Sequence, residues 1–329
     1  MSDSIGTFER ADHRAPRFEH GYSVDDAAHV LVVVSAENDR SPELLELEQN
    51  SLRFVMDAQD RHGRTRCRRD VFGRWTSAGA TGNCWGRSMW ATGVAAAHAS
   101  DPRLRRLARE TYDLGCTQTS SCTSPRALAF AALGAEQAVA TPFGKWGWTA
   151  PAARFAEWID ATPHDPSLRW PWPEARLVDT NAVLSDAAVA AGMVLDRIDL
   201  VRRGLELLEW LVVHDSFNGH LSPTPVGGAG PDDRAGRFAQ RPVEVATMAR
   251  AARRAFEATY DERWVNVVRS CARWFDGDND VSQPMWDPDT GAGFDGIHVG
   301  GVDRNCGAES TLAAMATMQQ HAAVMEMAA

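Results

Sequence analysis

Three short segments combine a carboxylate with proline, glycine or tryptophan where a loop leads into an apolar helix. They are residues 169–174 (Arg-Trp-Pro-Trp-Pro-Glu), 240–244 (Gln-Arg-Pro-Val-Glu) and 305–310 (Asn-Cys-Gly-Ala-Glu-Ser). An aromatic ring can stack on the CH-rich face of a pyranose, and a carboxyl group can bind hydroxyls or transfer protons. The repeated pattern therefore indicates a carbohydrate site that is lined by several helix starts.

The three carboxylates of these segments, Glu174, Glu244 and Glu309, are candidate catalytic residues. In glycoside hydrolysis one carboxylic acid protonates the leaving oxygen, and a second carboxylate activates water or attacks the sugar. Burial beside Trp170 and Trp172 would raise the pKa of Glu174, which predicts the acid role for it. A helix N-terminus would keep Glu244 or Glu309 ionised, which predicts the base role.

Each candidate also has a purely structural interpretation. Glu244 follows Pro242 by two residues, so it lies near the third position of a helix, where a carboxylate satisfies free backbone N–H groups. The position of Glu309 after Asn305 allows the same interpretation. Trp170 and Trp172 are equally consistent with a core role. Core positions are also expected for the tryptophans at helical spacing: Trp85, Trp90, Trp158, Trp210, Trp264 and Trp274.

Metal, thiol and histidine chemistry are not predicted. The Asp-rich segments 276–280 and 287–291 resemble calcium loops only loosely, because neither has the full ligand spacing with a terminal Glu. The six cysteines include no Cys-x-x-Cys pair, which indicates thiols in a reducing compartment. Cys306 lies near a helix start but has no obvious histidine partner. His214 and His220 are expected in solvent or core positions, so no metal or cofactor is expected.

Composition limits the class of protein. The 329 residues carry a formal net charge of −10, which argues against nucleic acid or an anionic membrane as the main partner. No basic segment followed by an apolar one opens the chain, and the apolar run 29–34 is too short to span a membrane. Lys145 is the only lysine among abundant Ala, Arg and Asp, a composition typical of GC-rich bacterial genomes. We therefore expect a soluble, cytoplasmic bacterial protein.

The spacing of apolar residues predicts an all-α protein. A helix or a strand is expected over 25–35, and helices over 42–59, 83–98, 104–114, 125–139, 151–161, 181–195, 200–213, 242–259, 262–275 and 308–321. Proline stands in the first turn of several of them, and Asn83 is expected to cap one. There is no βαβ alternation and no Gly-rich phosphate loop, which argues against a nucleotide-binding α/β fold.

Short turns alternate with long loops over 64–82, 163–179, 218–240 and 277–304, which predicts helical hairpins. Because no exact repeat is present, a closed ring of hairpins fits better than a regular solenoid. The long loops are expected on one face, with the three carboxylates in a common depression. Residues 1–22 are polar and aperiodic and are expected to be a flexible arm. Residues 23–329 are expected to form a single domain, because no linker interrupts them.

The order of motifs resembles a known family. Asn-Cys-Trp-Gly-Arg-Ser-Met-Trp at 83–90 is followed by Ser-Pro-Arg-Ala at 124–127 and then by the three acidic segments. Over residues 51–319 this order is similar to that of the (α/α)6-toroid glycosidase-like domains that are encoded with, or fused to, bacterial glycosyltransferases. The resemblance implies an (α/α)6 toroid, an oligosaccharide substrate and a glycosyltransferase as partner.

The residues that match the family's motifs are Glu174, Glu244, Glu309, Asn181 and Arg87. With the aromatic and polar residues beside them, the resemblance implies a substrate-binding set of Trp85, Arg87, Trp170, Trp172, Asp179, Asn181 and Gln240. Asn83, Thr180 and Ala239 stand where the family has acids, and Cys306 stands where it has glutamine.

These substitutions leave three functions open. The first is a glycoside hydrolase that uses paired carboxylates. The second is a sugar epimerase or isomerase, since toroids of this class also use acid–base pairs that include histidine. The third is a glycan-binding or scaffold protein without turnover, working beside a glycosyltransferase.

Overall fold

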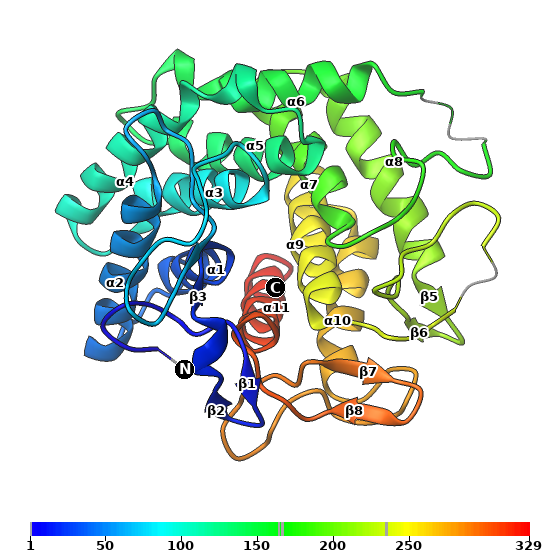
Figure 1. Ribbon diagram of the computed structural model, residues 1–329. Coiled ribbons are helices and arrows are strands. Elements are labelled where there is room, and N and C mark those ends of the chain that lie inside the picture. The colour runs from blue at the N-terminus through cyan, green and yellow to red at the C-terminus, as the bar shows by residue number, and fades with distance from the viewer. Residues whose placement is uncertain (1, 164, 166–167, 234–235) are drawn as a thin grey trace. The chain divides into compact units, whose positions relative to one another are not determined.

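The computed structural model describes residues 2–163, 165, 168–233 and 236–329 (Figure 1). One residue of the predicted arm (Met1) and five of the predicted loops (His164, Pro166, Ser167, Arg234 and Ala235) lie outside the described residues. Within the single domain that was predicted, the internal contacts distinguish two compact units. Unit 1 comprises Met1–Trp158 and Ala190–Ile198, and unit 2 comprises Ile159–Val189 and Asp199–Ala329.

The described residues form eleven α-helices, which confirms the all-α prediction. They are α1 Val24–Ser35, α2 Pro42–Ala58, α3 Asn83–His98, α4 Pro102–Cys116, α5 Pro125–Val139, α6 Ala150–Asp160, α7 Ala182–Val194, α8 Ile198–His214, α9 Pro242–Thr259, α10 Glu262–Phe275 and α11 Ala308–Met327. Three short 3-10 helices accompany them: η1 Phe18–His20, η2 Thr119–Ser121 and η3 Trp146–Thr149. No described helix is both long and apolar enough to cross a membrane.

The helix boundaries follow local signals in the sequence. The predicted bounds of α3, α5, α9 and α10 agree with the structure, and the ambiguous segment 25–35 is helical. Side chains of Ser41, Asp101, Ser124 and Asp261 accept N–H groups of the first turns of α2, α4, α5 and α10. The predicted capping role of Asn83 is wrong, because the N-cap of α3 is Gly82 and Asn83 already has helical geometry.

In unit 1, α1 contacts α2 and α3, and α3 in turn contacts α4 and α5. The contact between α3 and α5 depends on glycines that face each other. A Cβ on Gly93 would lie 2.3 Å from the carbonyl oxygen of Gly134, and a Cβ on Gly134 would lie 2.3 Å from that of Met89. Only a residue without a Cβ allows the two backbones to come this close.

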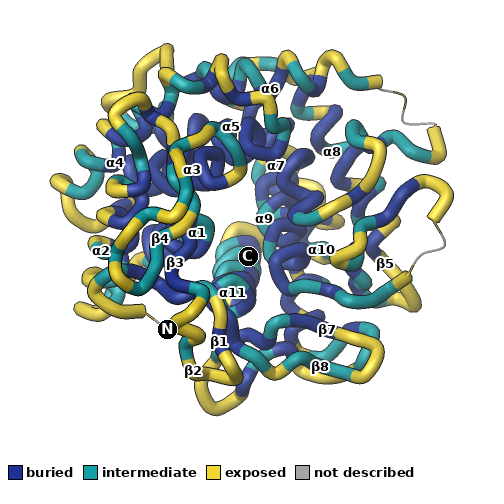
Figure 2. Tube along the Cα trace, viewed as in Figure 1, coloured by how far each residue is buried: buried dark blue, intermediate teal, exposed yellow. Residues whose placement is uncertain are grey.

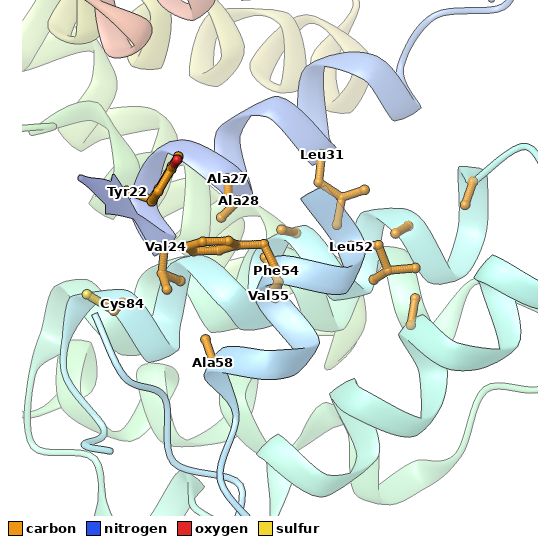
Figure 3. Close-up of a cluster of buried hydrophobic side chains, with 14 of the residues drawn as sticks. Tyr22, Val24, Ala27, Ala28, Leu31, Leu52, Phe54, Val55, Ala58 and Cys84 are labelled. Atoms are coloured by element: carbon orange, nitrogen blue, oxygen red, sulfur yellow. The ribbon is translucent and has the colours of Figure 1, made fainter. Parts of the chain in front are cut away.

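An apolar cluster around Tyr22, Leu31, Leu52 and Phe54 packs α1 and α2 together (Figure 3). Phe8 belongs to the same cluster, so the N-terminal segment is packed on unit 1 and the prediction of a flexible arm is wrong there. The short strands β1 Ala11–Asp12 and β2 Ala15–Pro16 pair with each other, and β3 Tyr22–Ser23 pairs with β4 Arg68–Arg69. A few widely spaced apolar side chains are enough to anchor this N-terminal segment, although their spacing matches neither a helix nor a strand.

Cys67 and Cys84 form a disulfide across a sequence separation of 17 residues. The other cysteines are thiols and take no part in this disulfide: Cys116, Cys122, Cys271 and Cys306. The prediction that all six are thiols was therefore wrong for one pair. The spacing of the cysteines in the sequence does not predict this disulfide, because the two residues meet only when the loop after α2 returns to the start of α3.

In unit 2, α9 contacts α10 and α11, which also contact each other. α7 and α9 are largely buried (Figure 2). A buried carboxylate on α7, Asp186, pairs with Arg250 (2.6 Å) and Arg254 on α9. Two hairpins complete this unit, β5 Ser216–Phe217 with β6 His220–Leu221, and β7 Gly296–His298 with β8 Gly301–Asp303.

Candidate active site

Glu244 lies in the first turn of α9, where Pro242 starts the helix, and its residue is only 6% exposed. Its carboxylate accepts backbone N–H groups from Thr180 (2.6 Å) and Asn181 (3.2 Å), which immediately precede α7. Thr180 has a φ of 51°, and such a left-handed residue can turn successive N–H groups toward one anion. Glu244 thus joins the start of α9 to the start of α7.

Burial raises the pKa of Glu244 to about 8, although the N–H groups of Thr180 and Asn181 act in the opposite direction. The carboxylates of Asp215 and Asp179 contribute to this raised pKa, because a second negative charge is unfavourable beside them. The base role predicted for Glu244 assumed that helix N–H groups would keep it ionised. In the structure the pKa is raised instead, since desolvation outweighs the donors.

Asn181 and Asp179 shape the other side of this contact. The side chain of Asn181 accepts the N–H of Val178 (2.9 Å) and donates to the carbonyl of the same residue (2.9 Å). Asn181 is fully buried and fixes the backbone turn, whereas Asp179 is partly exposed. Of these two predicted binding residues, Asp179 is the one with a surface that a ligand can reach.

Asp215, at the end of α8, is a member of the site that the sequence analysis did not include. Its Oδ1 accepts the hydroxyl of Thr224 (2.7 Å) and lies 2.9 Å from Nδ1 of His214. Asp215 is buried, and its charge contributes to the raised pKa of Glu244. In the sequence, Asp215 is marked only by its position after His214 at a helix end. This pattern alone does not predict a site, because it does not show which residues pack against the pair.

Gln240 is held by both its backbone and its side chain. Its backbone exchanges hydrogen bonds with Ile297 (2.9 and 3.0 Å), and its Nε2 donates to Asp280 (2.6 Å) and Ser222 (3.2 Å). The residue is fully buried. In the structure Gln240 therefore positions the segment before α9, and its amide nitrogen is already occupied by protein groups.

Asp280 belongs to the Asp-rich segment that resembles a calcium loop. It faces His220 (3.4 Å) and Arg237 (3.8 Å) as well as Gln240. Its charge is thus directed to protein donors and not to a shared ion centre. Among the described residues, no group of three or more His, Cys, Asp or Glu is arranged to hold a metal ion.

Glu309, in the first turn of α11, is 38% exposed in its side chain and lies 3.7 Å from Arg241. Arg241 is the N-cap residue of α9, so Glu309 and Glu244 are linked through the start of one helix. The start of α11 is satisfied by Asp295, which accepts the N–H of Gly307 (2.7 Å) and the hydroxyl of Ser310 (2.5 Å). Because Asp295 caps α11, the carboxylate of Glu309 is available to a ligand.

The two tryptophans of the first acidic segment have different environments. Trp172 is 4% exposed and stacks on Trp210, with ring centroids 5.8 Å apart. Trp170 is partly exposed, and its Nε1 donates to the carbonyl of Glu174 (2.9 Å). Trp172 therefore fills the core, and only Trp170 presents a surface for stacking. Glu174 is also partly exposed.

Arg87 and Trp85 lie on α3 in unit 1. Arg87 is buried, with its NH1 3.1 Å from Nε2 of His29, its Nε 3.9 Å from Asp25, and its guanidinium over the ring of Phe130. Trp85 has no exposed surface, so it belongs to the core and offers no face to a sugar. This corrects the binding role predicted for Trp85.

Unit 2 contains a cavity of about 260 Å³, but it lies away from the predicted carboxylates. Its lining residues are Asp160, Asp199, Leu200, Arg202, Arg203 and Glu206. Three of the predicted loops nevertheless meet around the start of α9. Leu177 pairs with Ala229, and Gln240 contacts Ser222, Asp280 and Ile297.

Comparison with known proteins gives no match in sequence and clear matches in structure. No family model matches the chain, and no curated protein matches it. A sugar epimerase from a ruminal bacterium superposes with a TM-score of 0.73 at 9% identity, over 99% of this chain and 93% of that one. A D-mannose isomerase superposes with a TM-score of 0.70 at 12% identity, over 99% and 93% of the two chains.

A further similar structure is the GH76A α-1,6-mannanase from Salegentibacter sp. HEL1_6, with a TM-score of 0.65 at 11% identity. The match covers 98% of this chain and 94% of that one. The fold is the (α/α)6 toroid. Toroids of this kind include sugar epimerases and glycosidases. The predicted architecture is thereby confirmed, while the activity has to be argued from the site.

Proposed function

We propose that this toroid is a carbohydrate-active enzyme that works by acid–base catalysis, and in the first place a glycoside hydrolase. The observation that carries the proposal is the buried carboxyl group of Glu244, whose pKa near 8 makes it a proton donor at neutral pH. Asp179 and Asp215 lie close enough to act on its charge. A protonated carboxyl group beside further carboxyl groups is the arrangement that glycoside hydrolysis requires.

In this proposal Glu244 protonates the leaving oxygen, and Asp179, which is partly exposed, activates water or attacks the sugar. Glu309, beside Arg241, and Glu174, beside Trp170, bind hydroxyl groups of the sugar. The similarity to a mannanase and to sugar epimerases supports a sugar substrate. The linkage and the stereochemical outcome follow from product analysis.

Sugar epimerisation or isomerisation is the second candidate, and one observation favours it. In unit 2, His214 lies 2.9 Å from the carboxylate of Asp215, and His220 lies 3.4 Å from that of Asp280. A histidine oriented by a carboxylate can take a proton from the carbon beside a sugar carbonyl, and an acid on the other face can return one. The similarity to a sugar epimerase and a D-mannose isomerase also supports this candidate.

One experiment separates the two reactions. The protein is incubated with α-1,6-mannan, cello-oligosaccharides, cellobiose and D-mannose in D₂O, and the products are analysed by NMR and mass spectrometry. Hydrolysis creates new reducing ends, whereas epimerisation or isomerisation keeps the mass of the sugar skeleton and incorporates deuterium at the reacting carbon. Binding without either product would select the third hypothesis, a glycan-binding protein.

The substitution Glu244→Gln is the decisive variant, because the amide keeps the shape and loses the transferable proton. We expect turnover to fall by about 10²–10⁴-fold. Glu209→Gln is the matched control, since Glu209 lies on an exposed part of α8 and forms an ion pair with the exposed Arg263. Equal activity of Glu244→Gln and the wild type would refute the proposed role, and absence of both binding and turnover across the panel would refute a carbohydrate function.

A glycosyltransferase partner and a cytoplasmic location are further parts of the proposal. Both come from the sequence resemblance and composition. The Cys67–Cys84 disulfide argues against the cytoplasmic location, because disulfides are more frequent in oxidising compartments. Co-purification from the native host, with fractionation of the cell, tests partner and location together.

A further inference from the structure

A partly exposed aromatic and histidine surface lies in unit 2 where the loop before α7 meets the end of α8. It is formed by Trp170, Trp210 and His214 and is called the indole–imidazole surface below. Trp210 and His214 are four residues apart on α8, so their side chains project from one face of the helix. Trp170 reaches this face from the loop.

The rings are arranged in an ordered stack. His214 stacks on Trp210, with ring centroids 5.2 Å apart and an interplanar angle of 29°. Trp172 also stacks on Trp210, with centroids 5.8 Å apart and an interplanar angle of 27°. Trp170 is nearly perpendicular to both rings, with its centroid 5.1 Å from that of Trp210 and 6.3 Å from that of His214. Because Trp172 is buried, the base of the stack is fixed in the core, and its outer members remain partly exposed.

The two nitrogens of His214 have different surroundings. Nδ1 lies 2.9 Å from Oδ1 of the buried Asp215, which also accepts the hydroxyl of Thr224. An acceptor carboxylate at Nδ1 keeps the proton on that nitrogen and leaves Nε2 as the second hydrogen-bonding group. No group among the described residues hydrogen-bonds Nε2, and the side chain of His214 is 27% exposed.

Resting on the function proposed above, we propose that the indole–imidazole surface is a pyranose-binding subsite. The sugar ring stacks on Trp170, and Nε2 of His214 hydrogen-bonds a sugar hydroxyl. An apolar ring face with an oriented polar group at its edge matches a pyranose, whose faces are rich in CH groups and whose rim carries hydroxyls.

Asp215 gives this subsite a connection to the catalytic group. The same carboxylate that orients His214 contributes its charge to the environment of Glu244. A sugar hydroxyl bound at Nε2 would therefore be linked through His214 and Asp215 to a charge that acts on the proposed acid. His214 acts here as a binding residue, and Asp215 acts as a positioning residue.

The test is an NMR titration of the Glu244→Gln protein, in which the amide keeps the shape of the side chain and turnover is expected to fall by about 10²–10⁴-fold. Cellobiose and methyl α-D-mannopyranoside are added up to their solubility limit, and the imidazole and indole resonances are followed. We expect selective shifts at His214 and Trp170, while His98 on α3 in unit 1 serves as the internal reference. The 15N shifts of His214 in the free protein should show the proton on Nδ1.

Two further variants separate binding from folding. His214→Phe keeps an aromatic ring on Trp210 and removes Nε2, so we expect the Kd to rise about five- to tenfold. Because the variant also removes the Nδ1 partner of the buried Asp215, a thermal melt checks that it is folded at the temperature of the titration. Trp170→Ala should weaken binding by a similar or larger factor. Sugar-induced shifts elsewhere in unit 2, with His214 and Trp170 silent and His214→Phe binding like the parent, would overturn the subsite and leave the proposed function standing.

The absence of any sugar-induced shift, together with the absence of turnover by the wild type, would overturn both proposals. A proton on Nε2 of free His214 would overturn the role of Asp215 even if the sugar binds. Each of these results is read from resonances that can be assigned with the His214→Phe and Trp170→Ala proteins.

Discussion

The carboxylate of Glu244 accepts a 2.6 Å hydrogen bond from the backbone N–H of Thr180, a residue 64 positions earlier in the chain. Thr180 is β-branched and has a φ of 51°, a conformation that such residues adopt only where the surroundings hold them. The contact therefore couples a strained turn before α7 to an acid in the first turn of α9. Strained residues next to a carboxyl group with a shifted pKa are typical of functional sites.

The first prediction concerns the pH dependence of stability. The pKa of Glu244 is raised from its ordinary value of 4.5 to about 8, so the folded protein binds a proton that the unfolded chain releases between these values. The contribution of the protonated group is present below pH 4.5 and is lost as the pH rises toward 8. The loss amounts to about 1.4 kcal/mol per pH unit at most.

Chemical denaturation of the wild type and of Glu244→Gln between pH 4 and 9 measures this effect, because the amide does not titrate. The unfolding free energy of the wild type should fall relative to that of Glu244→Gln as the pH increases. A difference that is independent of pH would show that Glu244 keeps an ordinary pKa, and the acid role would lose its basis.

The second prediction compares two neighbouring tryptophans. Trp172 is buried against Trp210, so Trp172→Ala should lower the unfolding free energy by about 3–5 kcal/mol. Trp170 is partly exposed, so Trp170→Ala should cost less stability and should mainly weaken sugar binding. Urea denaturation and sugar titration of both variants check this division. The reverse order of the two stability losses would contradict the environments described for these rings.

The third prediction concerns the buried charge of Asp186 on α7. Burial alone would raise its pKa, but the guanidinium groups of Arg254 and Arg250 outweigh burial and lower it. Asp186→Ala should cost about 3–5 kcal/mol, because it leaves two cations without their buried partner. Glu209→Ala, which breaks the exposed pair with Arg263, is the control and should change stability by less than about 1 kcal/mol. Similar losses in both variants would refute the prediction.

Because the pKa of Asp186 is lowered, its stabilising contribution should be present above its ordinary value of 3.8 and be lost as the pH falls below it. The pH dependence of this contribution is opposite in sign to that of Glu244. Thermal melts of Asp186→Asn and the wild type between pH 2.5 and 6 should therefore converge at the acidic end.

The fourth prediction concerns the Cys67–Cys84 disulfide. It closes a loop with a sequence separation of 17, and the chain-entropy relation gives a stabilisation of about 3 kcal/mol for a loop of this size. The double variant Cys67→Ser/Cys84→Ser should lose roughly this amount, and reducing agent should have no additional effect on it. Alkylation with mass spectrometry should find four reactive cysteines in the denatured, unreduced wild type. Six would contradict the disulfide.

The sequence by itself determined the helices from α2 onward and their order, while residues 25–35 fitted a helix or a strand. Helix starts depend on nearby residues, such as Ser124 before Pro125 in α5 or Asp261 before α10, so their position can be predicted without the tertiary structure. The alternation of short turns and long loops was enough to predict a ring of helical hairpins. Glu244 and Glu309 were also found from the sequence, because proline and glycine mark the helix starts on which they lie.

Only the tertiary structure decided what these residues contact. Glu244 meets the N–H groups of Thr180 and Asn181, and Asp215 and His214 enter the site from the end of α8, contacts that no local pattern predicts. Trp170 and Trp172 are two residues apart in one motif, yet only one is buried. The physical reason is that desolvation depends on what packs around a group, and packing partners come from distant parts of the chain.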